Sequence, residues 1–400
     1  MKGAGTITLA AGGLPVLVAW LVGLSGLPVA HRPMTDVLAE VLAVLMLVLG
    51  WRFRRGRLVV AAVALALANF LVRGPLAESP SEAGLATLAI LLPITLAVLS
   101  LLPESPVNRP VIVSLLGVVI VQSWLIATIG GGQQSSREGG LLSSISDLFT
   151  SPDLARLVFL IAGAFIALSY AARHSTFEGS LLWVTAASAL ALLAWNGPHA
   201  ATLAFSAAQL VLLIGLVEDS YRLAYHDELT GLPGRRALEE ALHTLDGDYT
   251  IAMVDVDHFK RFNDRHGHAA GDQALRMIAA ELQKVGGGGR AYRYGGEEFS
   301  IFFPGMAPAE ASEHLEVVCT AIADRRFAIR SSSRPRKKPD PPRKTSRPPK
   351  LISVTVSIGY AGPSARAGNS NAVLRAADRA LYRAKNKGRN RVVRYGARTA

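Results

Sequence analysis

The apolar residues of this chain are concentrated before residue 218, where long apolar runs alternate with short polar breaks. Most of the runs are near the roughly 20 residues that a membrane-spanning helix needs. About eight can be counted: residues 7–29, 35–50, 57–72, 84–102, 110–129, 154–171, 179–195 and 199–217. A buried soluble helical domain is the alternative, but so few charges in runs of this length argue against it. The sequence therefore predicts a multi-pass α-helical domain in a lipid bilayer over residues 1–218.

Basic residues between the runs predict how this domain is oriented, because cytoplasmic loops are enriched in Lys and Arg. With the N-terminus inside, the inner side receives Lys2, Arg52, Arg54, Arg55, Arg57, Arg109, Arg173 and Arg222. The outer side receives Arg32, Arg73 and Arg137. This asymmetry predicts that the C-terminal part of the chain lies in the cytoplasm.

The net charge of +12 comes largely from one Pro- and Ser-rich segment, residues 330–350. Within it, residues 331–350 carry eight Lys and Arg residues against Asp340, which gives about +7. Proline and like-charge repulsion both oppose packing, so we expect a basic disordered insertion. Docking on the anionic inner leaflet is a second interpretation. The segment has no aromatic residue to stack on a base, so no nucleic-acid partner is expected.

Two glycines and two acids, Gly295-Gly296-Glu297-Glu298, stand between two strand-like stretches and indicate a tight hairpin turn. Glycines at such a tip let the backbone approach a phosphate closely, and paired acids can hold a divalent cation. Taken alone, the stretch is equally an ordinary acidic turn.

A second acidic motif ends the apolar stretch Ile251–Val254, which is followed by Asp255 and, two residues later, Asp257. Carboxylates from Asp255 and Glu297 on neighbouring strands would suit Mg²⁺, which binds a few carboxylates together with substrate phosphates. For Asp257, capping of a helix and stabilisation of the fold remain equal alternatives.

Further stretches agree with these motifs in order and spacing: Asp227–Pro233, Asn263, Gly267–Asp272 and Ala384–Asn390. Over roughly residues 226–396 the chain resembles the GGDEF family of diguanylate cyclases. The resemblance implies a nucleotidyl-cyclase-like α/β sandwich with a mostly antiparallel central sheet over residues 227–396, preceded by a short linker helix at 219–226.

The order of the expected elements agrees with that fold. They are helix 235–245, strand 249–255, helix 269–285, hairpin 291–303, helix 307–324, strand 353–361, helix 371–387 and strand 391–395. Alternating elements of this kind indicate a split-βαβ sandwich, with helices packed on the faces of one sheet.

By resemblance, the expected reaction condenses two GTP molecules into cyclic di-GMP and releases pyrophosphate, with Mg²⁺ or Mn²⁺ as the cofactor. Because each domain holds one GTP, two catalytic domains must face each other in a homodimer. The expected location is the bacterial inner membrane, with the catalytic domain in the cytoplasm.

The resemblance also assigns the metal site and the catalytic groups. Asp255, the carbonyl of Val256 and Glu297 are expected to hold the metal, with Glu298 able to share it. Glu297 is also the expected proton acceptor. Lys260, in the turn after the strand, is expected to stabilise the transition state; a surface lysine is the alternative.

Substrate recognition is assigned to four residues. Lys385 and Arg389, four residues apart on one face of a helix end, are expected to bind the triphosphate; a solvated basic face is the alternative. Asn263 and Asp272 match the guanine-reading pair of the family. A carboxylate only accepts hydrogen bonds, and guanine offers donors at N1 and N2, which adenine does not.

One motif departs from the family. Many members carry an Arg-x-x-Asp product-binding site where this chain has Gly286–Gly289. We expect a flexible glycine loop there, and we hypothesise that product inhibition through this site is absent.

Two functions stay open: an active cyclase regulated by its membrane domain, and a catalytically silent nucleotide-binding receptor or membrane signalling protein. Asp255, Lys260, Glu297 and Asp272 together favour the cyclase, since a receptor needs no metal-binding acids. A transporter fused to a cyclase is disfavoured, because Glu40 is almost the only ionisable residue expected in the spans.

Overall fold

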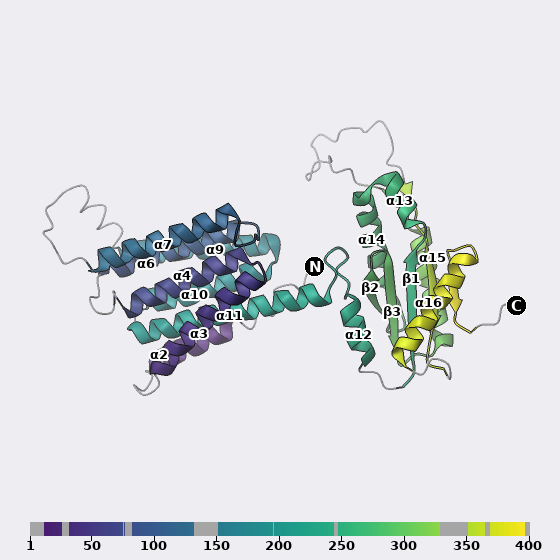
Figure 1. Ribbon diagram of the computed structural model, residues 1–400, viewed down its shortest axis with the longest axis horizontal. Coiled ribbons are helices and arrows are strands. Elements are labelled where there is room, and N and C mark those ends of the chain that lie inside the picture. Colours follow the sequence, from purple (N-terminus) through teal and green to yellow (C-terminus); the bar gives the residue numbers. More distant parts are fainter. Residues whose placement is uncertain are drawn as a thin grey trace. The chain divides into compact units, whose positions relative to one another are not determined.

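The computed structural model describes residues 12–25, 32–74, 76, 82–131, 151–194, 196–243, 247–328, 351–364 and 369–396. The chain divides into two compact units, Met1–Ser220 and Tyr221–Ala400. In Figure 1 the first is the helical bundle coloured purple to teal, and the second is the α/β domain coloured mainly green to yellow. The predicted basic insertion at 330–350 lies outside the described residues.

Seven described helices of the first unit are long and apolar enough to cross a membrane. They are α3 (Arg32–Arg52), α4 (Gly56–Arg73), α6 (Glu82–Leu101), α7 (Pro110–Gly131), α9 (Pro152–Arg173), α10 (Thr176–Leu193) and α11 (Pro198–Tyr225). The first of the eight expected spans contains only α2 (Gly13–Ser25), which has 13 residues. Such a helix rises about 20 Å, less than the roughly 30 Å of bilayer hydrocarbon. Among the described residues, seven of the eight expected spans are therefore present at full length; the first, 7–29, extends beyond the described residues and stays a prediction.

The seven long helices differ in how much of their surface the bundle covers. Within the apolar 18-residue stretch of each helix, more than half of the residues are buried in α4, α6, α10 and α11, against about a fifth in α3, α7 and α9. Hydroxyl side chains in the covered helices return their hydrogen bonds to their own backbone. Thr185 Oγ1 donates to Leu181 O at 2.7 Å, and Ser188 Oγ to Val184 O at 2.8 Å. Polar atoms are thereby satisfied where water is absent.

The last long helix, α11, is continuous over 28 residues. A helix of this length rises about 42 Å, which exceeds the hydrocarbon thickness of a bilayer. Of residues 219–226, which we expected to form a short linker helix, 219–225 are the end of α11.

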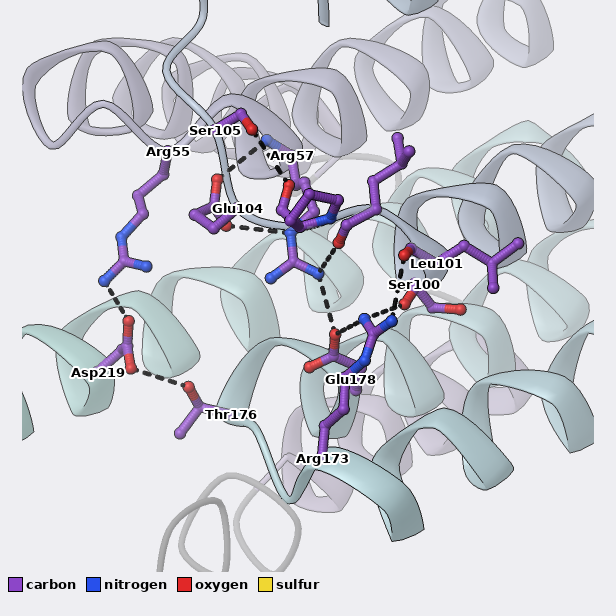
Figure 2. A network of polar contacts seen from close by, with 12 residues as sticks. Arg55, Arg57, Ser100, Leu101, Glu104, Ser105, Arg173, Thr176, Glu178 and Asp219 are labelled. Carbon is purple, nitrogen blue, oxygen red and sulfur yellow. Dashed lines mark hydrogen bonds and ion pairs between the residues drawn. The ribbon is translucent and has the colours of Figure 1, made fainter. Parts of the chain in front are cut away.

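Charged side chains from five segments meet at one end of the bundle, as Figure 2 shows. We call Arg55, Arg57, Glu104, Arg173, Glu178 and Asp219 the bundle-end cluster. At its centre, Arg57 Nη1 donates to Glu178 Oε1 at 2.9 Å and to Leu102 O at 3.0 Å. Arg57 Nε lies 3.1 Å from Glu104 Oε2. Both Arg57 and Glu178 are buried, so the expectation that Glu40 is nearly the only ionisable group in the helices is wrong.

The α/β unit is built on a five-stranded sheet in the order β2-β3-β1-β6-β7. The strands are β1 (Tyr249–Val256), β2 (Arg290–Gly295), β3 (Glu298–Pro304), β6 (Val356–Ala361) and β7 (Val392–Arg394). Only the pairing of β6 with β7 is parallel, and the other three are antiparallel. The predicted α/β sandwich with a mostly antiparallel sheet is confirmed. A separate two-stranded ribbon joins β4 (Phe327–Ala328) to β5 (Leu351–Ile352).

Helices cover both faces of the sheet, because successive side chains of a strand point to opposite sides. Ala252 and Val254 pack in one apolar core with α14 (His268–Leu282) and α15 (Pro308–Asp324). Ile251 and Met253 pack in a second core with α12 (Arg235–His243) and α16 (Ser370–Asn386). Every residue of the central strand β1 is therefore buried, and only its end can present a polar side chain to a ligand.

Candidate active site

Asp255 lies near the end of β1, opposite Glu298 of β3 on one side and Ser357 of β6 on the other. The hairpin between β2 and β3 turns at Gly296-Glu297, because Gly295 pairs with Glu298. The amide of Val256 donates to the carbonyl of Glu297 at 3.3 Å. This bond ties the tip of the hairpin to the end of β1, so the two predicted acidic motifs lie side by side.

Burial and neighbouring charges raise the proton affinity of an acid in each of the two motifs. Burial raises the pKa of the Asp255 carboxyl, the Lys385 ammonium opposes that rise, and the charge of Asp257 adds to it. Burial also raises the pKa of Glu297, and the charges of Asp255 and Glu298 raise it further. A divalent cation between these carboxylates would relieve both the desolvation and the mutual repulsion.

One cation of the chain already lies at this place. Lys385 Nζ is 2.9 Å from Asp255 Oδ2. No cluster of three or more His, Cys, Asp or Glu side chains arranged for a metal occurs among the described residues. Two carboxylates are enough for Mg²⁺ when substrate phosphates and waters complete its ligands. The donor set therefore fits a metal shared with a phosphate ligand, but not a closed structural metal site.

Lys260 is on a helix that the sequence reasoning missed. We expected it in a turn after β1, but it is the second residue of α13 (Phe259–His266) and is exposed. The turn is completed earlier, by His258, whose φ of 57° is left-handed. The Lys260 side chain therefore lies four residues beyond the end of β1, exposed on the first turn of α13, where it is accessible to an anionic ligand.

Lys385 and Arg389 do not share a helix face, contrary to expectation. Lys385 is in the last turn of α16, which ends at Asn386. Arg389 lies beyond that end with a φ of 63°, and its neighbours Gly388 and Asn390 are also left-handed, at 106° and 43°. The positive charge of Arg389 lowers the pKa of Asp255, so the turn brings this guanidinium toward the acids.

Asn263 and Asp272, the predicted guanine-reading pair, come from the consecutive helices α13 and α14. Gly271 lets these helices meet, because a side chain there would collide with Asn263 Oδ1. Asn263 Oδ1 is buried and has no hydrogen-bond partner. A buried amide oxygen without a partner is costly, and a donor on a bound base would satisfy it.

The four glycines at 286–289, which we expected to form a flexible loop, form a tight turn. Gly289 N donates to Gly286 O at 3.2 Å, and Gly287 and Gly288 have positive φ angles of 64° and 70°. A side chain at Gly287 would also collide with the ring of His314. A side chain at Gly289, where the family motif has its aspartate, would come within 2.8 Å of Phe303 and Val285, so the turn leaves no room for one there.

Asp227 and Arg293 stabilise the β2–β3 hairpin through an ion pair and a hydrogen bond. The sequence pattern alone had given neither residue a role. Arg293 Nη1 lies 2.7 Å from Asp227 Oδ1, and Arg293 Nη2 donates to the carbonyl of Gly296 at 2.6 Å. Burial opposes ionisation of Asp227, but hydrogen bonds from Thr230 and Arg293 outweigh it and lower its pKa. The sequence signal for this pair was the arginine directly before Tyr294-Gly295-Gly296, together with the acid that begins the motif Asp227–Pro233.

An acid-bearing hairpin on a mostly antiparallel α/β sandwich is the arrangement expected of a cyclase-type domain. Residues 224–338 match the family described as "Diguanylate cyclase, GGDEF domain". The C-terminal part of the chain is a GGDEF domain, and the predicted family is confirmed.

Curated relatives and solved structures are similar to a part of this chain. Diguanylate cyclase DgcP of Pseudomonas aeruginosa is 39% identical over 186 residues, which are 44% of this chain and 25% of DgcP. Diguanylate cyclase VdcA of Vibrio cholerae is 35% identical over 174 residues, 42% of this chain and 47% of VdcA. The chain thus spans less than half of these relatives' length. The crystal structure of the coiled coil and GGDEF domain of DgcB from Caulobacter crescentus, in complex with c-di-GMP, is 31% identical. Its match covers 46% of this chain and 91% of that structure, with a TM-score of 0.39.

Proposed function

We propose that this chain is a membrane-anchored diguanylate cyclase, which condenses two GTP into cyclic di-GMP and releases pyrophosphate. The observation that carries the proposal is the close approach of Asp255 to the Gly296-Glu297 turn, with Lys385 Nζ on Asp255 at 2.9 Å. Two carboxylates, Asp255 and Glu297, at one sheet edge beside a lysine and an arginine suit a metal-bound triphosphate.

Bound Mg²⁺ or Mn²⁺ would lower the pKa of the attacking 3′-hydroxyl and neutralise charge on the leaving group. Asp255 and Glu297 would hold it, with the carbonyl of Val256 and with Glu298 as additional ligands. Glu297 has a raised pKa, and this suits the proton acceptor, because a base works best when its pKa is near the working pH.

The remaining site residues would bind the substrate. Lys260, Lys385 and Arg389 supply positive charge for the phosphates, and Lys385 would exchange Asp255 for a phosphate oxygen as the metal arrives. Gly295 and Gly296 leave the hairpin backbone open to the same phosphates. Asn263 and Asp272 would hold the base, since Asp272 can only accept and guanine donates from N1 and N2.

One domain offers one such set of residues, and joining two GTP molecules requires a second. We therefore propose that two copies of the chain face each other, with each α/β domain holding one GTP. The seven apolar helices would place the pair at the bacterial inner membrane with the catalytic domains in the cytoplasm.

The bundle would regulate this pairing through α11, which is continuous to Tyr225. Asp219 of α11 pairs with Arg55 and accepts from Thr176 Oγ1 at 3.3 Å. One turn earlier, Gly215 packs so closely on α10 that a side chain would collide with Ser180 Oγ. Both contacts hold the end of α11 to the bundle, so a change in the bundle would change the position or rotation of that end.

The test of the proposed reaction uses the full-length protein in lipid nanodiscs loaded with two copies, supplied with GTP and Mg²⁺. We expect cyclic di-GMP and pyrophosphate in a 1:2 ratio, and no product with ATP. Absence of product from folded, dimeric protein under these conditions would favour the silent nucleotide-binding receptor.

A further inference from the structure

Asp257 is the one buried carboxylate at the site edge that the proposed reaction leaves without a task. It follows β1 and is buried. The N-cap residue of α13 is His258, so Asp257 does not cap that helix. Its own amide donates to Thr355 O at 2.9 Å. The two roles that the sequence left open are thus reduced to one, a role inside the fold.

The Asp257 carboxylate joins three segments that are distant in sequence. Ser357 Oγ donates to Oδ1 at 2.7 Å, and Thr355 Oγ1 donates to Oδ2 at 2.7 Å. The backbone amide of Asn390 donates to Oδ2 at 3.1 Å. A carboxylate has about four acceptor positions, and three are used by protein donors. Asp257 is therefore occupied as a hydrogen-bond acceptor and is not available as a full metal ligand.

The bond to Asn390 holds a turn that is unfavourable on its own. Gly388, Arg389 and Asn390 are three consecutive residues with positive φ. For residues other than glycine this conformation is unfavourable, and it persists only where surrounding structure fixes it. The amide of Arg389 bonds back to Ala384 O at 3.1 Å, and Ile358 N donates to Arg391 O at 2.9 Å. Among these contacts, only the one from Asp257 ties the turn to the segment that also carries the metal-binding acid.

We infer that Asp257 is a positioning residue that fixes Arg389 for the triphosphate. Asp255 and Asp257 lie two residues apart, so the metal end of the site and the guanidinium end are set by one short stretch of backbone. The inference rests on the proposed function, because it takes GTP phosphates as the ligand of Arg389. Loss of the Asp257 charge should loosen the turn and weaken GTP binding while the metal-binding acids stay in place.

The test compares Asp257→Asn, Ser357→Ala and Arg389→Ala, alone and combined, in the full-length protein. The side chain of Asn keeps the shape of the carboxylate but has one acceptor oxygen instead of two. The readouts are the Kd for a non-hydrolysable GTP analogue with Mg²⁺, and kcat and KM with GTP. We expect Asp257→Asn to raise the Kd and KM about tenfold and to change kcat less than threefold. Ser357→Ala, which leaves the Asn390 bond intact, should stay within twofold.

The double variant separates positioning from general loss of structure. If Asp257 acts through Arg389, Asp257→Asn should add nothing to the Kd of Arg389→Ala. Multiplying effects, or a Kd for Asp257→Asn equal to that of the unaltered chain, would overturn the inference. Should Asp257→Asn not fold, the variant Thr355→Val with Ser357→Ala loosens the carboxylate from its other side. It is expected to raise the Kd about threefold, again only when Arg389 is present, and an unchanged Kd would overturn the inference.

Failure of the proposed function would look different. In that case the unaltered chain would bind the analogue without turnover, or would bind no analogue at all. Binding without turnover leaves the comparison of Kd values intact. Absence of binding would overturn the proposed function, and the inference with it.

Discussion

The bundle-end cluster and the candidate active site treat charge in opposite ways. In the bundle, Arg57 and Glu178 are 2.9 Å apart, and Arg57 is satisfied further by Glu104 and the carbonyl of Leu102. In the α/β domain, Asp255 and Glu297 repel each other, and Lys385 alone is paired with Asp255 in the described structure. Charges that find partners within the chain stabilise its fold, whereas an excess of one sign with shifted pKa values marks a place where a ligand supplies the partner.

The largest effect expected from this comparison is on catalysis. Glu297→Gln keeps the shape of the side chain and removes its charge, so it should lower cyclic di-GMP synthesis by about 10²–10⁴-fold, the usual contribution of a catalytic base. Product formation by the full-length variant is measured against the unaltered chain. Glu310→Gln, on the first turn of α15, is the matched control and should keep full activity. Activity of Glu297→Gln within twofold of the unaltered chain would contradict the assignment.

In the bundle the expected effect is on stability. Glu178→Ala leaves Arg57 buried without its closest acid, and removing one partner of a buried pair typically costs about 3–5 kcal/mol. Thermal unfolding in nanodiscs should shift to clearly lower temperature. The exposed pair of Asp153 and Arg156, at 3.0 Å, offers the control, because Asp153→Ala should change stability by less than about 1 kcal/mol. Equal shifts for both variants would show that the cluster is not a closed structural network.

The choice of base should depend on Asp272. A hydroxyl can donate as well as accept, so Asp272→Ser should reduce discrimination against ATP by about 10–100-fold, which corresponds to one or two lost hydrogen bonds. Competition between the two nucleotides for the full-length protein measures this ratio. Undiminished GTP selectivity would mean that the base is recognised elsewhere.

The open acids should destabilise the domain when no cation is bound. The pKa of Glu297 is raised in the folded state, so as pH rises the unfolded state releases this proton at a lower pH than the folded state does. The free energy of unfolding therefore falls as pH rises from about 4 through the raised pKa. Without divalent ions at pH 7, Glu297→Gln should therefore unfold at a slightly higher temperature than the unaltered chain. The difference should vanish as pH falls below 4. A variant less stable at pH 7 would contradict mutual repulsion at the site.

The smallest effect is expected from the reaction product. Gly286–Gly289 carry no side chain to bind guanine, and the turn is packed on His314. Added cyclic di-GMP should therefore leave the progress curves of GTP turnover unchanged at low micromolar concentration. Strong non-competitive inhibition there would reveal another product site.

Most elements of the α/β domain could be predicted because local signals agree with the fold. The apolar stretch of β1, the glycines of the hairpin and the apolar periodicity of α16 all fall where the structure has them. Helix α13 could not be predicted, because it has only eight residues and most of them are polar. It also begins after His258, whose left-handed backbone is not predicted by any local sequence pattern.

The part of the site that lies on two paired strands could be predicted from the sequence. The part whose conformation depends on contacts between distant segments could not. Asp255 and Glu297 meet because β1 pairs with β3. The conformation of Arg389 depends on the turn that follows α16, and that turn is held by an acid 133 residues away from Asn390. In the bundle, Glu178 was missed because the apolar run begins at residue 179, whereas the helix begins at Thr176.

The central claim, that the acids of the α/β domain are held open for a divalent cation shared with a nucleotide, is tested most directly by Mn²⁺ binding. Electron paramagnetic resonance of the full-length protein with a non-hydrolysable GTP analogue counts bound Mn²⁺ without requiring turnover. The account predicts Mn²⁺ bound in the unaltered chain only when the analogue is present, and at least tenfold weaker binding in Asp255→Asn. Equal Mn²⁺ binding by the two proteins would contradict it.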